Sequence, residues 1–189
     1  MRNYLFFLFL LTTITGFAQN KIEWSNDYRL SKDDFQAKAP DNGSFQSASG
    51  SFYVEYEIGG MNLITSRNLN KNVTCFFQKD ASYIEDGDEA STEKIIRYQQ
   101  LLFDLYELQA RNLRKKFFEE RKIILTKGPA QLREEVASEH IKLVSKVESE
   151  TNQGSELQKT KEWEKWVKNE LEALADFCKT CKPNKKKRK

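Results

Sequence analysis

The apolar positions that follow residue 50 have the spacing of β-strands. In residues 52–58 every second side chain is apolar, which predicts a strand with one buried face. Two glycines at positions 59 and 60 predict a hairpin turn, and residues 61–65 and 73–77 predict two further strands. The first part of the chain is therefore expected to form an antiparallel sheet.

From residue 91 onward the apolar spacing becomes helical. Ser91 predicts an N-cap, and the helix that follows carries two neighbouring apolar stripes, which is typical of a helix at the centre of a core. Gly128-Pro129 predicts the end of this helix and the start of a second one. The sequence Asn152-Gln153-Gly154 predicts another break, and residues 155–158 match a capping box for a third helix. Strands followed by helices predict an α+β fold, with an N-terminal antiparallel sheet and then three helices.

The two ends of the chain differ from its body. Residues 1–18 resemble a signal peptide, with Arg2 before an apolar run and small residues, Gly16 and Ala18, at the cleavage positions. The run is too short for a comfortable membrane span and no second run follows. We therefore expect an exported protein, periplasmic or extracellular, without a transmembrane segment after cleavage. Residues 19–181 are expected to form one domain, and residues 182–189 a basic disordered tail.

The charge of the chain restricts its partners. The formal net charge is only +3, and much of the excess of Lys and Arg lies in the tail, so the body offers no dedicated nucleic-acid surface. The tail suits an anionic lipid or polymer at the cell envelope, although a solvated terminus is the usual state of such a charge block. The basic tail residues are Lys185, Lys186, Lys187, Arg188 and Lys189.

Cysteine and histidine are scarce, so each position carries information. Three cysteines in an exported chain leave one unpaired. Cys178 and Cys181 are spaced for a local disulfide, whereas Cys75 lies in a strand and is expected to pack as a small apolar residue. His140 is the only histidine, and we expect it to face solvent on the second helix.

Short blocks spread over nearly the whole mature chain carry a family resemblance. They are Trp24 with Leu30 and Asp33-Asp34-Phe35, Ser82-Tyr83-Ile84, Phe103-Asp104 with Glu107 and Ala110-Arg111, Glu150-Thr151-Asn152-Gln153-Gly154, and Trp163 with Leu171. In this order they resemble a bacterial domain-of-unknown-function family of predicted secreted zinc-dependent proteases. The resemblance implies a zincin-like fold, with a metal-binding helix that reads His-Glu-Gln-x-His-Phe-Asp and a later Glu-Thr-x-His-Gly element.

This chain departs from the family at the positions that would do the chemistry. The two helix histidines map to Tyr98 and Leu102, the catalytic Glu to Gln99, and the later His to Gln153. Zinc in such enzymes is held by three protein ligands, and the Glu takes a proton from the metal-bound water. Leucine cannot coordinate, and tyrosine and amide oxygens are poor zinc ligands. The resemblance therefore implies a degenerate member with no catalytic residue, metal or other cofactor: a pseudoenzyme with a binding or structural role in the envelope.

Alternatives remain at this stage. Tyr98 and Leu102, four residues apart on a helix, also fit ordinary core packing. Asp104 and Glu107 form a possible residual polar site, which would allow a metal-dependent hydrolase with ligands other than histidine. More often such carboxylates pair with neighbours, and Arg111 lies four residues after Glu107. A third possibility is a module that binds anionic surface polymer through its basic tail.

Overall fold

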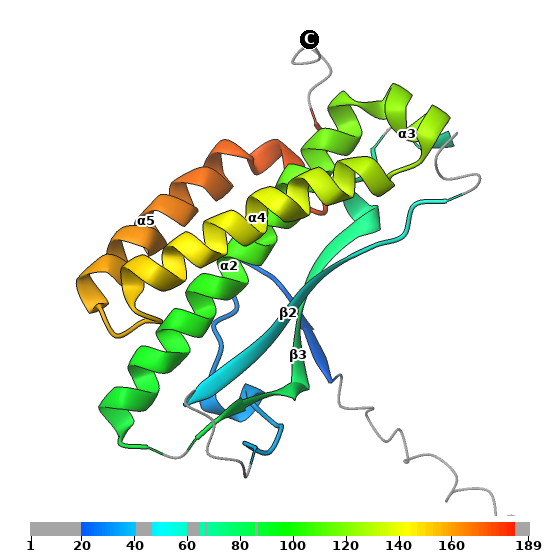
Figure 1. The fold of residues 1–189 in the computed structure, drawn as a ribbon. Helices are drawn as coiled ribbons and strands as arrows, with labels where there is room; N and C mark the ends of the chain where they lie inside the picture. Colours follow the sequence, from blue (N-terminus) through cyan, green and yellow to red (C-terminus); the bar gives the residue numbers. More distant parts are fainter. Residues whose placement is uncertain (1–19, 41–46, 60–64, 67, 86, 184–189) are drawn as a thin grey trace, which may run out of the picture.

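A computed structural model describes residues 20–40, 47–59, 65–66, 68–85 and 87–183 (Figure 1). The predicted signal peptide, the tail residues from 184 and nearly all of the predicted strand at 61–65 lie outside these ranges. None of the helices in the described ranges combines the length and apolar character that a membrane span requires. The main elements are β1 (Lys21–Glu23), β2 (Ala48–Tyr56), β3 (Val73–Ile84), α2 (Glu89–Glu119), α3 (Arg121–Lys127), α4 (Ala130–Thr151) and α5 (Leu157–Ala173).

The α+β order predicted from the sequence is confirmed. The described strands form an antiparallel sheet in the order β1-β3-β2, and four α-helices follow it. The prediction of three helices was wrong because the first predicted helix divides at Glu120, which caps both α2 and α3 with a non-helical backbone. This break lets α3 turn so that Ile124 is buried in the core beside the sheet. No Gly or Pro lies beside Glu120 in the sequence, so no local residue predicts this break.

Helix α2 is the central element, as its two apolar stripes predicted. One side packs against the sheet, where Phe103 and Phe117 join Val73 and Phe77 of β3 in one core cluster. Another side packs against α4 and α5, in a second cluster that includes Leu105. Figure 1 shows α4 and α5 crossing α2 on the side away from the sheet. The long helix is thus buried between two layers.

The sheet is irregular where β2 approaches α2. Between Ser49 and Ser51 the register on β3 jumps from Tyr83 to Gln78. The buried Ser82 bridges this gap, since its hydroxyl accepts from the Ser51 amide at 2.9 Å and donates to the Gln78 carbonyl. The irregularity places residue 50 directly beside the side chain of Gln99 on α2.

The helix ends agree in part with those predicted from the sequence. Asp88, not Ser91, is the N-cap of α2, and its carboxylate accepts from the Ser91 amide at 2.9 Å. The predicted end at Gly128-Pro129 is confirmed, because α3 ends at Lys127 and α4 begins at Ala130. The predicted break after α4 is also confirmed, but the N-cap of α5 is Glu156 and its side chain makes no capping bond.

Candidate functional site

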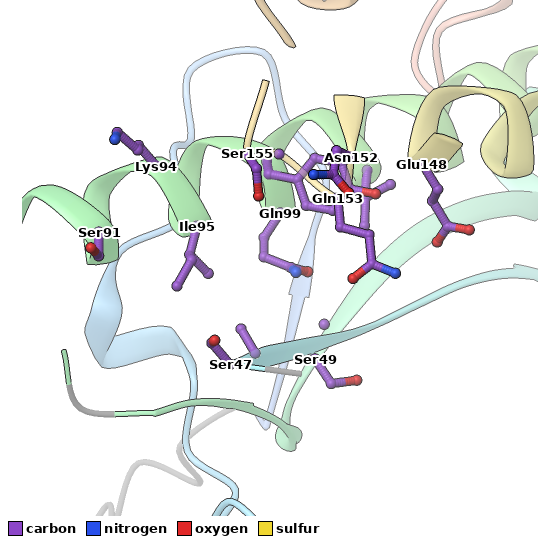
Figure 2. Close-up of a pocket in the computed structure, with 15 residues that line it drawn as sticks. Ser47, Ser49, Ser91, Lys94, Ile95, Gln99, Glu148, Asn152, Gln153 and Ser155 are labelled. Atoms are coloured by element: carbon purple, nitrogen blue, oxygen red, sulfur yellow. The ribbon is translucent and has the colours of Figure 1, made fainter. Parts of the chain in front are cut away.

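A cavity of about 560 Å³ lies between α2, the start of β2 and the turn that joins α4 to α5 (Figure 2). We call it the α2–β2 pocket. It brings together all four positions that the resemblance assigned to the lost metal site, namely Tyr98, Gln99, Leu102 and Gln153. Its other lining residues are Ser47, Ala48, Ser49, Gly50, Ser91, Lys94, Ile95, Glu148, Asn152, Gly154 and Ser155.

Gln99 is a buried amide that points from α2 toward β2 (Figure 2). Its side chain is 5% exposed, and its Oε1 atom has no hydrogen-bond partner. The amide fits only because residue 50 is glycine: a Cβ there would collide with Gln99 Oε1 and with the ring of Phe52. The glycine at the irregular part of β2 therefore makes room for a polar group that the protein itself does not pair.

Tyr98 contributes a second unpaired polar group. It is also 5% exposed, and its hydroxyl has no hydrogen-bond partner. Burial raises the pKa of the Tyr98 phenol well above its usual range, and the charge of Glu148 raises it further, whereas Thr151 lowers it. The Thr151 hydroxyl donates its own proton to the Val147 carbonyl at 2.7 Å. Tyr98 is therefore a neutral phenol at physiological pH, with none of the phenolate character that a metal ligand needs.

The turn after α4 holds Gln153 in an unusual backbone conformation. Asn152 and Gln153 have φ of 46° and 52°, values that residues other than glycine rarely adopt and that cost about 1 kcal/mol or more each. Gly154 follows with φ of 89°, and a Cβ at this position would collide with the Tyr98 side chain. Figure 2 shows that the strained turn directs the Gln153 amide toward the pocket, between Gln99 and Glu148.

The lining is rich in groups that both donate and accept hydrogen bonds. It contains the hydroxyls of four serines and the amides of Gln99, Asn152 and Gln153. Glu148 supplies a carboxylate, whereas the Lys94 ammonium points away from the cavity in Figure 2. Within the part of the chain that the structure describes, no three His, Cys, Asp or Glu residues are grouped in a way that could hold a metal ion.

Asp104 and Glu107 are not part of this pocket, and the structure does not bring them together at one site. Asp104 lines a second cavity of about 860 Å³ that also borders α5. There its Oδ1 atom accepts from Trp24 Nε1 at 2.7 Å and from Gln100 Nε2 at 3.0 Å. Burial raises the pKa of the Asp104 carboxyl, and these two hydrogen bonds partly oppose the rise.

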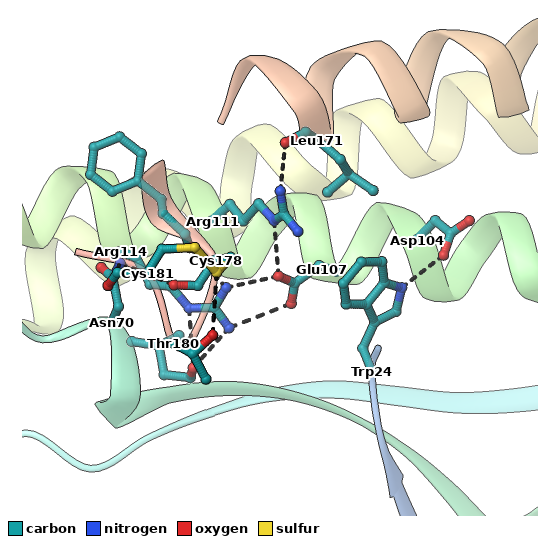
Figure 3. Close-up of polar contacts among 12 residues, drawn as sticks. Trp24, Asn70, Asp104, Glu107, Arg111, Arg114, Leu171, Cys178, Thr180 and Cys181 are labelled. Carbon is teal, nitrogen blue, oxygen red and sulfur yellow. Dashed lines mark hydrogen bonds and ion pairs between the residues drawn. A yellow bond between two sulfur atoms is a disulfide. The ribbon is translucent and has the colours of Figure 1, made fainter. Parts of the chain in front are cut away.

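Glu107 lies at the centre of a buried ion cluster (Figure 3). Its Oε1 atom accepts from Arg111 Nε at 3.0 Å, which confirms the predicted pair, and from Arg114 Nη1 at 2.8 Å. Arg114 also donates to the carbonyls of Val73 and Phe177. The role of Arg114 was not predicted, although an arginine seven residues after Glu107 lies on the same helix face. The cluster connects α2 to β3 and to the C-terminal segment.

His140 is buried, so the prediction that it faces solvent was wrong. It is 7% exposed, and its ring packs edge-on against Tyr106 with ring centroids 4.4 Å apart. Its Nε2 atom has no hydrogen-bond partner, and burial lowers the pKa of His140 to about 4. The apolar spacing of α4 could have shown that His140 is buried. His140 follows the buried Val136 by four residues and so lies on the same, core-facing side of the helix. His140 lines a separate, smaller cavity and not the α2–β2 pocket.

The cysteines lie away from the pocket. Cys178 and Cys181 form a disulfide, and Cys75 is buried in β3, as predicted. Burial raises the pKa of the Cys75 thiol well above its usual range. The disulfide loop is fixed by Asn70, whose side-chain amide donates to the carbonyls of Asp176, Cys178 and Cys181 (Figure 3).

Removing either unpaired polar group from the pocket is expected to stabilise the protein. Tyr98→Phe and Gln99→Leu each eliminate a buried group that lost its hydration without gaining a partner, which is worth about 1–3 kcal/mol. Thermal unfolding followed by circular dichroism measures the effect. Tyr53→Phe is the matched control, because the Tyr53 hydroxyl donates to Gln78 Oε1 at 3.0 Å and its loss should destabilise. Equal destabilisation by Tyr98→Phe and Tyr53→Phe would contradict the assignment.

Comparisons with known proteins assign no family to this chain. The chain matched no protein-family model, no curated protein and no solved structure. The zincin-like fold therefore stays a prediction that rests on the sequence resemblance.

Proposed function

We propose that the protein is an exported, non-catalytic binding protein, a degenerate relative of zincin-like peptidases, whose α2–β2 pocket takes up a small polar ligand in the cell envelope. One observation carries the proposal. Tyr98, Gln99 and Leu102 on α2 and Gln153 on the α4–α5 turn line one cavity, although Gln153 lies far from the others in the sequence. These positions have lost the residue types that bind zinc, yet a cavity with polar walls is present beside them.

The chemistry of the lining supports binding over catalysis. A serine nucleophile needs an adjacent base, and His140, the only histidine, lines a different cavity. Gln99 stands where the resembled enzymes have a glutamate, and an amide cannot take a proton from water. Polar side chains that converge on a cavity of this size are typical of sites for small ligands.

The two alternative functions gain less support. A hydrolase built on Asp104 and Glu107 would need both carboxylates at one site, but Asp104 borders the second cavity and Glu107 is engaged by Arg111 and Arg114. Attachment through the basic tail depends on Lys185 to Lys189, which lie outside the described residues. We place the binding function in the α2–β2 pocket because polar side chains from three parts of the chain converge on that cavity.

Metal analysis tests the non-catalytic proposal. We expect the purified mature protein to contain no stoichiometric zinc and to show no chelator-sensitive cleavage of casein. The chemical reason is that Leu102 and the amides of Gln99 and Gln153 are poor or impossible zinc ligands. One zinc ion per chain, lost together with proteolysis when a chelator is added, would overturn the proposal.

Restoring the histidines tests whether these positions correspond to a former metal site. The variant Tyr98→His/Leu102→His/Gln153→His is expected to bind Zn²⁺ at a 1:1 ratio, because it places three imidazoles around one cavity. The matched control, Tyr98→His/Leu102→His/Gln158→His, keeps the helix pair and moves the third histidine to a residue that does not line this pocket. We expect at least roughly tenfold weaker Zn²⁺ binding by the control, since its third histidine does not converge with the other two. Equal affinities would count against the correspondence.

A further inference from the structure

The α2–β2 pocket also indicates which class of ligand it takes. We infer, on the basis of the proposed binding function, that this pocket binds a neutral, hydroxyl-rich ligand, namely a saccharide. Three properties of the described residues support this assignment: the kinds of hydrogen-bonding groups in the lining, the distribution of charge around the cavity, and the unpaired amide of Gln99.

The hydrogen-bonding groups of the lining match hydroxyls better than they match ions. Each serine hydroxyl and each amide has both donor and acceptor atoms, although the Ser91 hydroxyl already donates to Asp88 Oδ2 at 2.7 Å and offers a ligand only its acceptor. A sugar hydroxyl also donates and accepts, so it can pair with every one of these groups. An ammonium group only donates and a carboxylate only accepts, so either ion would use only the acceptor atoms or only the donor atoms of the lining. The polar lining residues are Ser47, Ser49, Ser91, Gln99, Asn152, Gln153 and Ser155.

The charges around the cavity oppose an anionic ligand. Glu148 directs its carboxylate along the wall of the pocket, beside Gln153, while Lys94 extends from the opposite side of α2 (Figure 2). A carboxylate in a saccharide site accepts hydrogen bonds from ligand hydroxyls, which are strengthened by its charge. The same carboxylate repels an anion. Ile95 and Leu102 add apolar surface that the C–H groups of a sugar ring can contact.

Gln99 supplies the observation that points most directly to a ligand. Its side chain is more than nine-tenths buried, points into the cavity and leaves Oε1 unpaired. Buried amides are normally hydrogen-bonded by the protein itself. A glycine at residue 50 leaves room for this one. An amide held in place without a partner is prepared to bond a ligand, at the position where the pocket meets β2.

Binding of three sugars that share one skeleton tests the inference. Glucose, glucosamine and glucuronate, titrated into the mature protein and followed by ¹H–¹⁵N NMR of the glutamine side-chain amides, differ mainly in charge. We expect glucose and glucosamine to shift the Gln99 and Gln153 amide signals, and glucuronate to bind at least roughly tenfold more weakly because Glu148 repels it. Propylamine and acetate, which are charged but carry no hydroxyls, are expected to cause no shift.

Two variants separate a functional amide from a structural one. Gln99→Leu should weaken glucose binding by roughly tenfold or more while raising the melting temperature. Glu148→Gln should raise the affinity for glucuronate relative to that for glucose, because it removes the repulsion but also the charge that strengthens hydrogen bonds from the sugar. Glu134→Gln, on an exposed residue of the same helix that borders none of the three cavities described above, is the matched control and should change neither affinity.

The possible outcomes distinguish this inference from the proposed function. Shifts with propylamine but not with glucose would overturn the saccharide assignment and leave a binding pocket for amines. No shift with any probe would overturn the saccharide assignment as well. Stoichiometric zinc with chelator-sensitive proteolysis would overturn the non-catalytic proposal instead. Cellobiose and cellohexaose identify the source of the sugar, because a polymer site should bind the longer chain more tightly, whereas a site for a free monosaccharide should prefer glucose.

Discussion

Glu107→Gln is expected to lower the free energy of unfolding by about 3–5 kcal/mol, the largest effect of any single substitution considered for this protein. The change keeps the shape of the side chain but removes the negative charge that Arg111 and Arg114 share. These arginines are 8% and 1% exposed, so water cannot replace the lost carboxylate. Urea unfolding followed by far-UV circular dichroism measures the loss as a shift of the midpoint.

A surface ion pair provides the control for this prediction. Arg97 donates to both carboxylate oxygens of Glu164, at 2.6 Å and 2.7 Å, but both side chains are partly exposed. Glu164→Gln should therefore lower the stability by no more than about 1 kcal/mol. Similar losses in the two variants would show that burial does not govern the strength of the Glu107 cluster.

Stability should fall as the pH falls from about 6.5 to about 4, with a contribution from His140 of roughly 3 kcal/mol. The pKa of this histidine is about 4 in the folded protein, against 6.5 for an ordinary histidine. Over this interval the unfolded chain binds a proton that the folded protein does not, so acid favours unfolding. The contribution of His140 is complete above pH 6.5, is lost progressively toward pH 4, and changes no further below that value.

The measurement is the difference in pH dependence between the wild type and His140→Gln. Carboxylates also titrate in this range, but they contribute to both proteins and cancel in the difference. Tyr106, Glu139 and Glu170 are the titratable groups beside His140, and Glu139→Gln serves as a control that should keep the histidine-dependent slope. Parallel stability curves for the wild type and His140→Gln would contradict the prediction.

The elements that the sequence predicted well were those set by local patterns. The double apolar stripe of α2 identified the central helix, and the breaks at Gly128-Pro129 and at residues 152–154 were located from their turn residues. The division at Glu120 could not be predicted, because its cause is the packing of Ile124 in the core and not a local breaking residue. Ser91 was a reasonable N-cap, but Asp88 precedes it and its carboxylate takes that role.

Only part of the pocket lining could be predicted from the sequence. The resemblance identified Tyr98, Gln99, Leu102 and Gln153, which do share a cavity. It could not identify residues 47–50, because their approach to α2 depends on a strand irregularity that is set by tertiary hydrogen bonds. Nor could it reveal that Gln99 Oε1 and the Tyr98 hydroxyl are buried without a hydrogen-bond partner. Whether a polar group finds a partner depends on the folded surroundings.

The contacts of Asn70 have a consequence for how the chain reaches its folded state. The amide of this residue shares its hydrogens among carbonyls 106 to 111 positions further along the chain. Arg114 likewise depends on Phe177 to complete its donors beside β3. During synthesis the sheet and α2 therefore emerge from the ribosome long before the segment that satisfies these buried groups. Late closure of such distant contacts is expected to make folding slow, with the sheet and α2 waiting for the C-terminal segment.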